Sequence, residues 1–155
     1  MMQESSLVPE QQVIVDQFWR YSLQVYAAPE VKSLCLSLQN KYQCNVNLLL
    51  WLGFCKQQRW MVNLDYLQRN IDDSEQKLKQ FRDYRSVVKP LISQRQYDLL
   101  LQHELKLEQR QQQKLVISQQ RYPGGLPAEQ ALSAYLEQVE LSPEEYLQRV
   151  ALALG

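Results

Sequence analysis

Residues 46–57 constrain the fold more than any other part of the sequence, because this segment is apolar on nearly every side. Asn45 precedes the segment and suits a helix N-cap, since its side-chain oxygen can accept a first-turn N–H that has no partner. A helix without a polar face is surrounded by other helices. The sequence therefore predicts a central helix over residues 46–57, and Gly53 within it indicates a close approach by a neighbour.

Apolar side chains recur at helical spacing along the rest of the chain, and no stretch alternates with the period of two that a strand requires. We therefore expect no strands. The pattern predicts the starts of further helices near these residues: Pro9, Pro29, Leu64, Ser74 and Asp98. The predicted fold class is all-α, a single irregular bundle of about seven helices.

One long apolar face is predicted after Ser74, and it consists of Leu78, Phe81, Tyr84, Val88, Leu91 and Ile92. Pro90 should kink or end this helix, because proline removes one backbone hydrogen bond and clashes with the preceding turn. The chain also contains 24 glutamines. Glutamine is an uncharged helix former, so this enrichment suits exposed helix faces.

The clearest linker covers residues 122–127 and contains two prolines and two glycines. It divides a helical domain, residues 10–121, from a C-terminal helical pair, residues 127–155, whose second helix opens with a capping box of Ser142 and Glu145. Residues 77–121 carry 10 basic and 4 acidic side chains, whereas residues 122–155 carry 1 basic and 5 acidic ones. We therefore expect the tail to dock on the basic segment.

Composition indicates a soluble cytoplasmic protein. The three cysteines lack the spacing of a metal or redox motif and are expected to be reduced thiols. The first residues carry no basic-then-apolar signal, and the longest apolar stretch is far shorter than the roughly 20 residues that cross a bilayer. We therefore expect no membrane segment.

Several separated segments are similar to a known family: Phe18-Trp19, Cys35-Leu36, Asn45-Val46-Asn47-Leu48-Leu49-Leu50, Val87-Val88 with Pro90-Leu91, and Glu104-Leu105 with Glu108. In order and spacing they resemble an uncharacterised all-helical bacterial family, a domain of unknown function, over roughly residues 18–117. The family commonly has an acid, a glycine and an acid where this chain has Asn40, Gln43 and Asn45. The resemblance implies a helical fold and a cytoplasmic location, and it implies no activity.

Glu104 and Glu108 are the most interesting candidates for chemistry. They are four residues apart on the side of a helix that also carries leucines, where a carboxylate is costly unless it is paired. Two such carboxylates could act as acid and base or bind a metal. The alternative, which we favour, is that they pair with Arg82, Arg85 or Arg95 on the preceding helix.

Arg82, Arg85 and Lys89 form a basic stripe with two aromatic neighbours, and such a stripe can grip phosphates and stack bases. A sequence pI of 6.6 lacks the basic excess usual in nucleic-acid binders. The only histidine, His103, lacks the spacing of a metal motif, and no cofactor pattern is present. We expect no cofactor.

The aromatic side chains could line a ligand pocket, although helical spacing favours core packing for them; they are Phe18, Trp19, Tyr21, Tyr26, Trp51 and Trp60. Because no reactive group of residues is complete, we expect a non-catalytic protein-interaction module with an unidentified protein partner. Two alternatives remain open. One is a small-ligand binder or enzyme that uses Glu104 and Glu108 with Arg82 and Arg85, and the other is an RNA-binding accessory protein.

Overall fold

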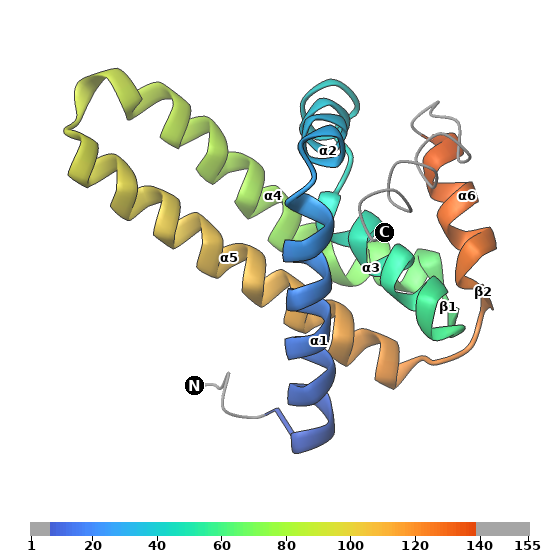
Figure 1. Cartoon of the computed structure of the whole chain (residues 1–155). Helices are drawn as coiled ribbons and strands as arrows, with labels where there is room; N and C mark the ends of the chain where they lie inside the picture. Colours follow the sequence, from blue (N-terminus) through green and yellow to red (C-terminus); the bar gives the residue numbers. More distant parts are fainter. Residues whose placement is uncertain (1–6, 139–155) are drawn as a thin grey trace.

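The computed structural model describes residues 7–138. These residues form six α-helices, a 3₁₀ turn and one two-stranded ladder (Figure 1). In chain order the elements are α1 (Pro9–Tyr26), α2 (Pro29–Tyr42), α3 (Val46–Gln58), β1 (Met61–Val62), α4 (Leu64–Val88), η2 (Lys89–Leu91), α5 (Gln94–Arg121), β2 (Leu126–Pro127) and α6 (Ala128–Gln138). The all-α prediction is confirmed, with six helices in residues 7–138 instead of about seven.

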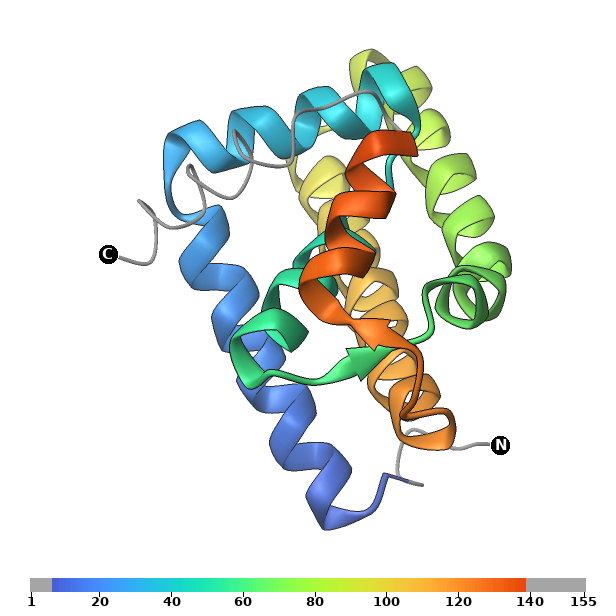
Figure 2. The same cartoon turned by 90° about the vertical axis from the view of Figure 1, so that its right-hand side faces the viewer.

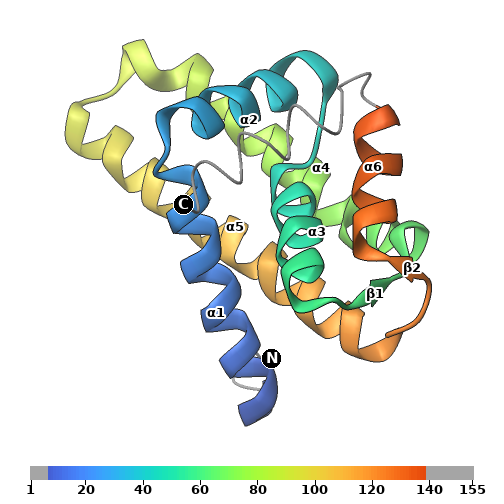
Figure 3. The ribbon, with the colours of Figure 1, turned by 45° about the vertical axis from the view of Figure 1, so that its right-hand side comes forward.

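Helix α3 is the central helix, as predicted. Every residue from Asn47 to Cys55 is buried, and helices α1, α2, α5 and α6 pack around α3 (Figure 3). The Asn45 side chain caps the helix by accepting the N–H of Leu48 at 3.0 Å. Gly53 faces α1, where the Tyr21 hydroxyl lies 2.5 Å from the position that a Cβ would take. That contact is the close approach that the glycine indicated.

Helices α4 and α5 differ from the predicted boundaries. The residues near Leu64 and the pattern from Ser74 belong to one continuous helix of 25 residues, which is why six helices are found. No break occurs at Asp98, because the chain turns earlier, after η2. Ser93 caps α5 by accepting the Gln96 N–H at 3.1 Å, and the Gln96 side chain accepts the Ser93 N–H at 3.0 Å.

The outer part of the α4–α5 hairpin projects away from the bundle (Figure 1). We call residues 79–110 the arm. Leu78 and Gln111 are buried on either side of it, but no residue of the arm is buried. The arm is therefore a helical hairpin without a core of its own.

The chain after α5 returns to the bundle through a short ladder. Strands β1 and β2 are antiparallel, with Met61 opposite Pro127 and Val62 opposite Leu126, so the expectation of no strands is wrong. Gly125 makes the pairing possible, because its φ is +124° and a Cβ there would overlap the Val62 carbonyl oxygen.

Helix α6 continues from β2 and packs mainly against α3, and it lies in front of part of α3 in Figure 2. Its inward side chains Ala131, Leu132 and Leu136 join the main hydrophobic core. The expected docking of the tail on the basic segment is therefore wrong for α6. The predicted second helix of the C-terminal pair lies outside the described residues.

All three cysteines are buried and unpaired with one another. Burial raises the pKa of Cys35 to about 12 and that of Cys44 to about 11, so neither is a thiolate at neutral pH. Within residues 7–138 no helix has both the length and the apolar character needed to span a membrane.

Candidate functional site

The candidate carboxylates and arginines meet on the inner side of the arm. The Arg85 guanidinium contacts Glu104, with Nε donating to Oε1 at 2.5 Å, and Arg85 also donates to the Tyr97 hydroxyl at 2.9 Å. Arg82 lies 3.7 Å from both Glu104 and Glu108, close enough for an ion pair and too far for a hydrogen bond. The predicted pairing of glutamates with arginines is thus what the structure contains. We call these four residues the charged cluster.

The cluster is largely shielded from water. The side chains of Arg82 and Glu104 are only 14% and 12% exposed. Burial raises the pKa of Glu108, the Arg82 charge opposes this shift and the Glu104 charge adds to it. Burial alone would lower the pKa of Arg85, but its hydrogen bonds to Glu104 and Tyr97 outweigh burial and raise it. Each charge therefore has a close counter-charge, and the cluster is electrically balanced.

Lys89 is the third member of the predicted basic stripe, and it takes no part in the cluster. Its ammonium lies 5.1 Å from the centre of the Tyr97 ring, a cation–π distance. The three basic residues therefore have different surroundings. Two are engaged by carboxylates and one covers an aromatic ring.

A cleft of about 280 Å³ lies between the cluster and helices α1, α2 and α3. Arg82, Glu104 and Glu108 line one side, and Trp19, Tyr26, Leu36 and Leu50 are among the residues opposite. The lining of this cleft also includes the side-chain amides of Asn47 and Gln112. The glutamates lie in a cleft, as a ligand site would require, but arginines already neutralise them.

Hydrogen bonds between buried side chains extend from Asn47 and Gln112 into the core, between four helices. Asn47 of α3 donates to the Gln111 side chain at 2.9 Å and accepts from Gln112 at 3.1 Å. Gln112 also donates to Ser22 of α1, and Gln111 donates to Ser74 of α4, each at 3.0 Å. These residues form a polar network through the core.

The sequence did not reveal this network. Glutamine enrichment was expected to mark exposed faces, yet Gln111, Gln112 and Gln119 are buried. They fall in a glutamine-rich stretch of α5 that contains few apolar residues, so hydrophobic spacing cannot distinguish the buried glutamines from the exposed ones. A polar Asn47 within the apolar α3 segment was the one available signal.

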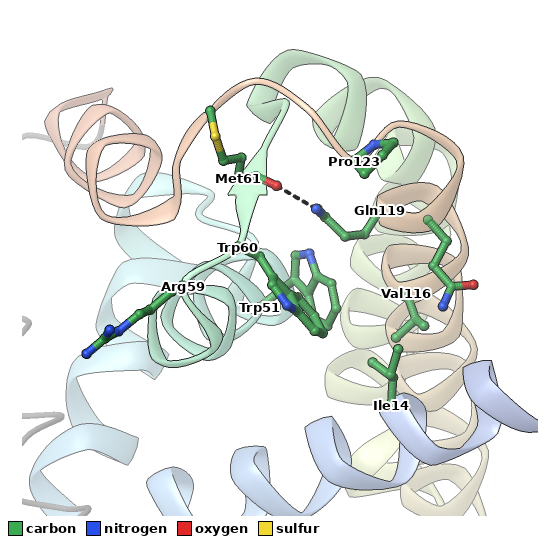
Figure 4. A pocket seen from close by; sticks show the side chains of 9 residues that line it. Ile14, Trp51, Arg59, Trp60, Met61, Val116, Gln119 and Pro123 are labelled. Carbon is green, nitrogen blue, oxygen red and sulfur yellow. Dashed lines mark hydrogen bonds between the residues drawn. The ribbon is translucent and has the colours of Figure 1, made fainter.

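The predicted aromatic set divides between core and cavities. Phe18 and Trp51 pack edge to face with ring centres 4.8 Å apart, and Tyr21 packs against Phe54, as core packing requires. Trp19 and Tyr26 line the cleft beside the charged cluster. Trp51 and Trp60 also line a second cavity, shown in Figure 4.

Nothing in the described part of the chain gathers three or more metal-binding side chains of the His, Cys, Asp or Glu type. His103 packs against Phe81, with ring centres 5.0 Å apart, and so lies on the arm beside an aromatic ring.

The arm is also where large apolar side chains are exposed. Six of the thirteen exposed large apolar side chains in residues 7–138 fall within residues 84–105, although this range is only a sixth of the described chain: Tyr84, Val87, Leu91, Leu99, Leu101 and Leu105. Exposure reaches 69% at Val87 and 78% at Leu91. Tyr84 and Leu91 were predicted to share a buried face with Leu78, and only Leu78 is buried.

Comparison with known proteins yields one match. A family model described as a protein of unknown function (DUF2390) matches residues 17–115. The chain belongs to this family. The match covers the second half of α1, all of α2 to α4 and most of α5, and so includes the charged cluster and the whole arm of this DUF2390 protein. No curated protein and no solved structure matches the chain.

Proposed function

We propose that this DUF2390 protein is a non-catalytic, cytoplasmic protein-interaction module of bacteria, and that it binds a partner protein through the arm. The observation that carries the proposal is the apolar surface of residues 84–105 on a hairpin that has no core of its own. Apolar side chains concentrated on one projecting element typify a binding surface, because water solvates them poorly.

The charges of the arm indicate the chemistry of the partner. Glu104 and Glu108 are engaged by Arg82 and Arg85, so the remaining surface of the 77–121 segment is basic. Arg95 is exposed near the turn and has no acidic side chain within ion-pair distance among the described residues. A partner with an apolar face bordered by acidic residues would complement this surface.

The pairing of Glu104 and Glu108 with Arg82 and Arg85 supports a non-catalytic role over an enzyme or an RNA-binding protein. A carboxylate held by arginine is a poor general base and a poor metal ligand, since its charge is already compensated. Equally, Arg82 and Arg85 could bind RNA phosphates only by leaving Glu104 and Glu108 uncompensated in a shielded site, which is costly.

Photo-crosslinking from the arm tests the proposal. The crosslinking residue p-benzoylphenylalanine is introduced at Leu99, which is 57% exposed, and at Val13 of α1, which is 54% exposed, as the matched control. In living bacterial cells, Leu99 should give one dominant protein adduct that Val13 does not give. The double variant Val87→Ser/Leu91→Ser should abolish that adduct and leave the melting temperature nearly unchanged, because both side chains are exposed.

The crosslinked partner must also bind through charge complementarity with the basic surface of the arm. With the purified partner, Arg95→Glu should weaken binding more than Arg121→Glu, an exposed control at the other end of α5, and added salt should reduce the difference. The same adduct from Val13, an adduct with RNA, or equal effects of the two arginine variants would contradict binding through the arm.

A further inference from the structure

The cleft beside the charged cluster has two unlike walls. Its charged lining residues are the four members of the cluster, two arginines and two glutamates, so the lining carries no net charge. The opposite wall is formed by side chains without charge, among them Trp19, Tyr26 and Leu36. A molecule in this cleft would therefore meet ionic groups on one side and aromatic and aliphatic groups on the other.

One carboxylate and one guanidinium of the cluster are accessible to such a molecule. Glu108 is 31% exposed, and neither of its carboxylate oxygens accepts a hydrogen bond from the described residues. Nε and Nη1 of Arg82 are buried, but Nη2 is not, and it lies 3.7 Å from Glu108 Oε1. Arg85 and Glu104 are already joined by hydrogen bonds. Glu108 and Arg82 therefore present a negative and a positive group side by side, each able to form further hydrogen bonds.

These two groups favour a ligand that carries both charges. An anion that engaged Arg82 would be repelled by Glu108, and a cation that engaged Glu108 would be repelled by Arg82. A zwitterion supplies a counter-charge to each group, so neither is left uncompensated in the shielded cleft. The cleft therefore favours a ligand of zero net charge with one cationic and one anionic group.

The spacing of the pair indicates how far apart the two charges of the ligand lie. In an α-amino acid the ammonium and the carboxylate are attached to one carbon, with roughly 2.5 Å between the nitrogen and the carboxyl carbon. This short zwitterion can lie antiparallel to two groups that are 3.7 Å apart, with its ammonium beside Glu108 and its carboxylate beside Arg82. A zwitterion whose charges are several bonds further apart would extend beyond one of the two groups.

The opposite wall and the volume indicate the side chain of the ligand. An aromatic ring would pack favourably against the rings of Trp19 and Tyr26. The cleft holds about 280 Å³, nearly twice the roughly 150 Å³ that accommodates benzene. Phenylalanine has twice as many non-hydrogen atoms as benzene and therefore fits this volume.

We propose that the cleft binds a free aromatic α-amino acid of the size of phenylalanine. Its ammonium contacts Glu108, its carboxylate contacts Arg82, and its ring packs against Trp19 and Tyr26. This site goes beyond the proposed interaction through the arm and does not depend on it.

L-Phenylalanine is the probe, and two singly charged analogues are the controls. Phenethylamine lacks the carboxylate, and 3-phenylpropionate lacks the ammonium. In an NMR titration of the full chain at neutral pH, L-phenylalanine should bind about tenfold more tightly than either analogue, because each lacks one charged hydrogen bond. The indole N–H signal of Trp19 should shift on binding, whereas that of Trp60, which does not line the cleft, should not.

Two charge-changing variants should reverse the order of the ligands. Glu108→Gln leaves the cluster with one excess positive charge, so 3-phenylpropionate should bind more tightly than L-phenylalanine. Arg82→Gln leaves one excess negative charge, so phenethylamine should become the preferred ligand. Asp83→Asn is the matched control, because it removes an exposed charge next to Arg82 and should keep the preference for L-phenylalanine. A variant that only loosened the fold would weaken all three ligands alike.

Equal affinities of the natural chain for L-phenylalanine and its two analogues would overturn the proposal, as would the absence of saturable binding at millimolar L-phenylalanine. An unchanged order of ligands in Glu108→Gln would also contradict it. If Arg82→Gln does not fold, the natural chain and Glu108→Gln still decide. Val87, Leu91 and Leu99 are unaltered in every variant, so failure here leaves the crosslinking result unaffected.

Discussion

Glu75 is a carboxylate in the core whose charge should make stability depend on pH. It is 8% exposed on α4, its Oε1 accepts from Gln111 at 3.5 Å, and its Oε2 has no partner among the described residues. Burial raises its pKa, although the Arg82 charge, the Gln111 hydrogen bond and the Lys79 charge oppose the shift. The folded state therefore retains the proton to a higher pH than the unfolded state does.

The extra proton on Glu75 in the folded state determines whether stability rises or falls with pH. Unfolding releases it between the ordinary and the raised pKa of Glu75, so the contribution of Glu75 to the unfolding free energy falls as pH rises through that window. We therefore expect Glu75→Gln to be more stable than the natural chain at pH 7.5, with the advantage shrinking as the pH falls through that window. Urea unfolding at several pH values measures the difference.

Asp83 is the control for this prediction, because it is an exposed carboxylate on the same helix. Asp83→Asn removes one negative charge without changing a buried site. An advantage of Glu75→Gln that is constant across the pH range would contradict a raised pKa.

Some residue-scale features could be predicted from the sequence because they depend on near neighbours. The cap at Asn45 and the small residue at Gly53 are of this kind. Gln43 is more instructive. It ends α2 with φ 57° and ψ 31°, a left-handed conformation that glycine adopts most easily, and the resemblance gives a glycine there. The burial of Gln111 and Gln112 depends on partners from other helices, so local sequence did not predict it.

At the scale of elements, a buried hydrogen bond joins α6 to the start of α3, in addition to apolar packing. The Tyr135 hydroxyl accepts the backbone N–H of Asn45 at 2.8 Å, at the start of the central helix. We expect Tyr135→Phe to lower the unfolding free energy by about 1–3 kcal/mol, because the buried N–H would lose its partner. Chemical denaturation of the full chain measures this loss.

Tyr97→Phe is the matched control, since it removes a tyrosine hydroxyl that a partly exposed arginine contacts on the arm. It should cost less than Tyr135→Phe. Equal losses of unfolding free energy in the two variants would contradict a stabilising role for the Tyr135–Asn45 hydrogen bond.

Helix boundaries show where local patterns mislead. The apolar pattern predicted a helix start near Ser74, yet α4 passes straight through this residue. The true boundary between α4 and α5 is set by Pro90 and by the Ser93–Gln96 capping box. Asp98, the predicted helix cap, does not cap a helix. It lies inside α5, where its side chain accepts a hydrogen bond from the Gln94 side chain at 2.8 Å.

At the scale of the whole molecule, the all-α class and the central helix were predictable, because an apolar α3 leaves few arrangements for its neighbours. The pairing of Glu104 with Arg82 and Arg85 was predictable from charge and helical spacing. The projection of the arm was not. Its apolar stripe has the spacing of a buried face, but no other helix of residues 7–138 packs over Leu91, which is therefore exposed.

The coreless arm implies that the molecule opens in two stages. Amide protons of residues 79–110 are held by helical hydrogen bonds but by no buried side chain, whereas those of residues 47–55 lie in the core. In native-state hydrogen exchange, the arm should exchange through local opening, at a lower free energy than global unfolding, and α3 should exchange only when the whole chain unfolds. Uniform protection across both segments would contradict this.

Local opening also gives partner binding a measurable signature. A partner that contacts only the folded arm would raise the opening free energy of residues 79–110 with its concentration and leave exchange in α3 nearly unchanged. The arm would then report its own occupancy through the rate at which its amide protons exchange with solvent.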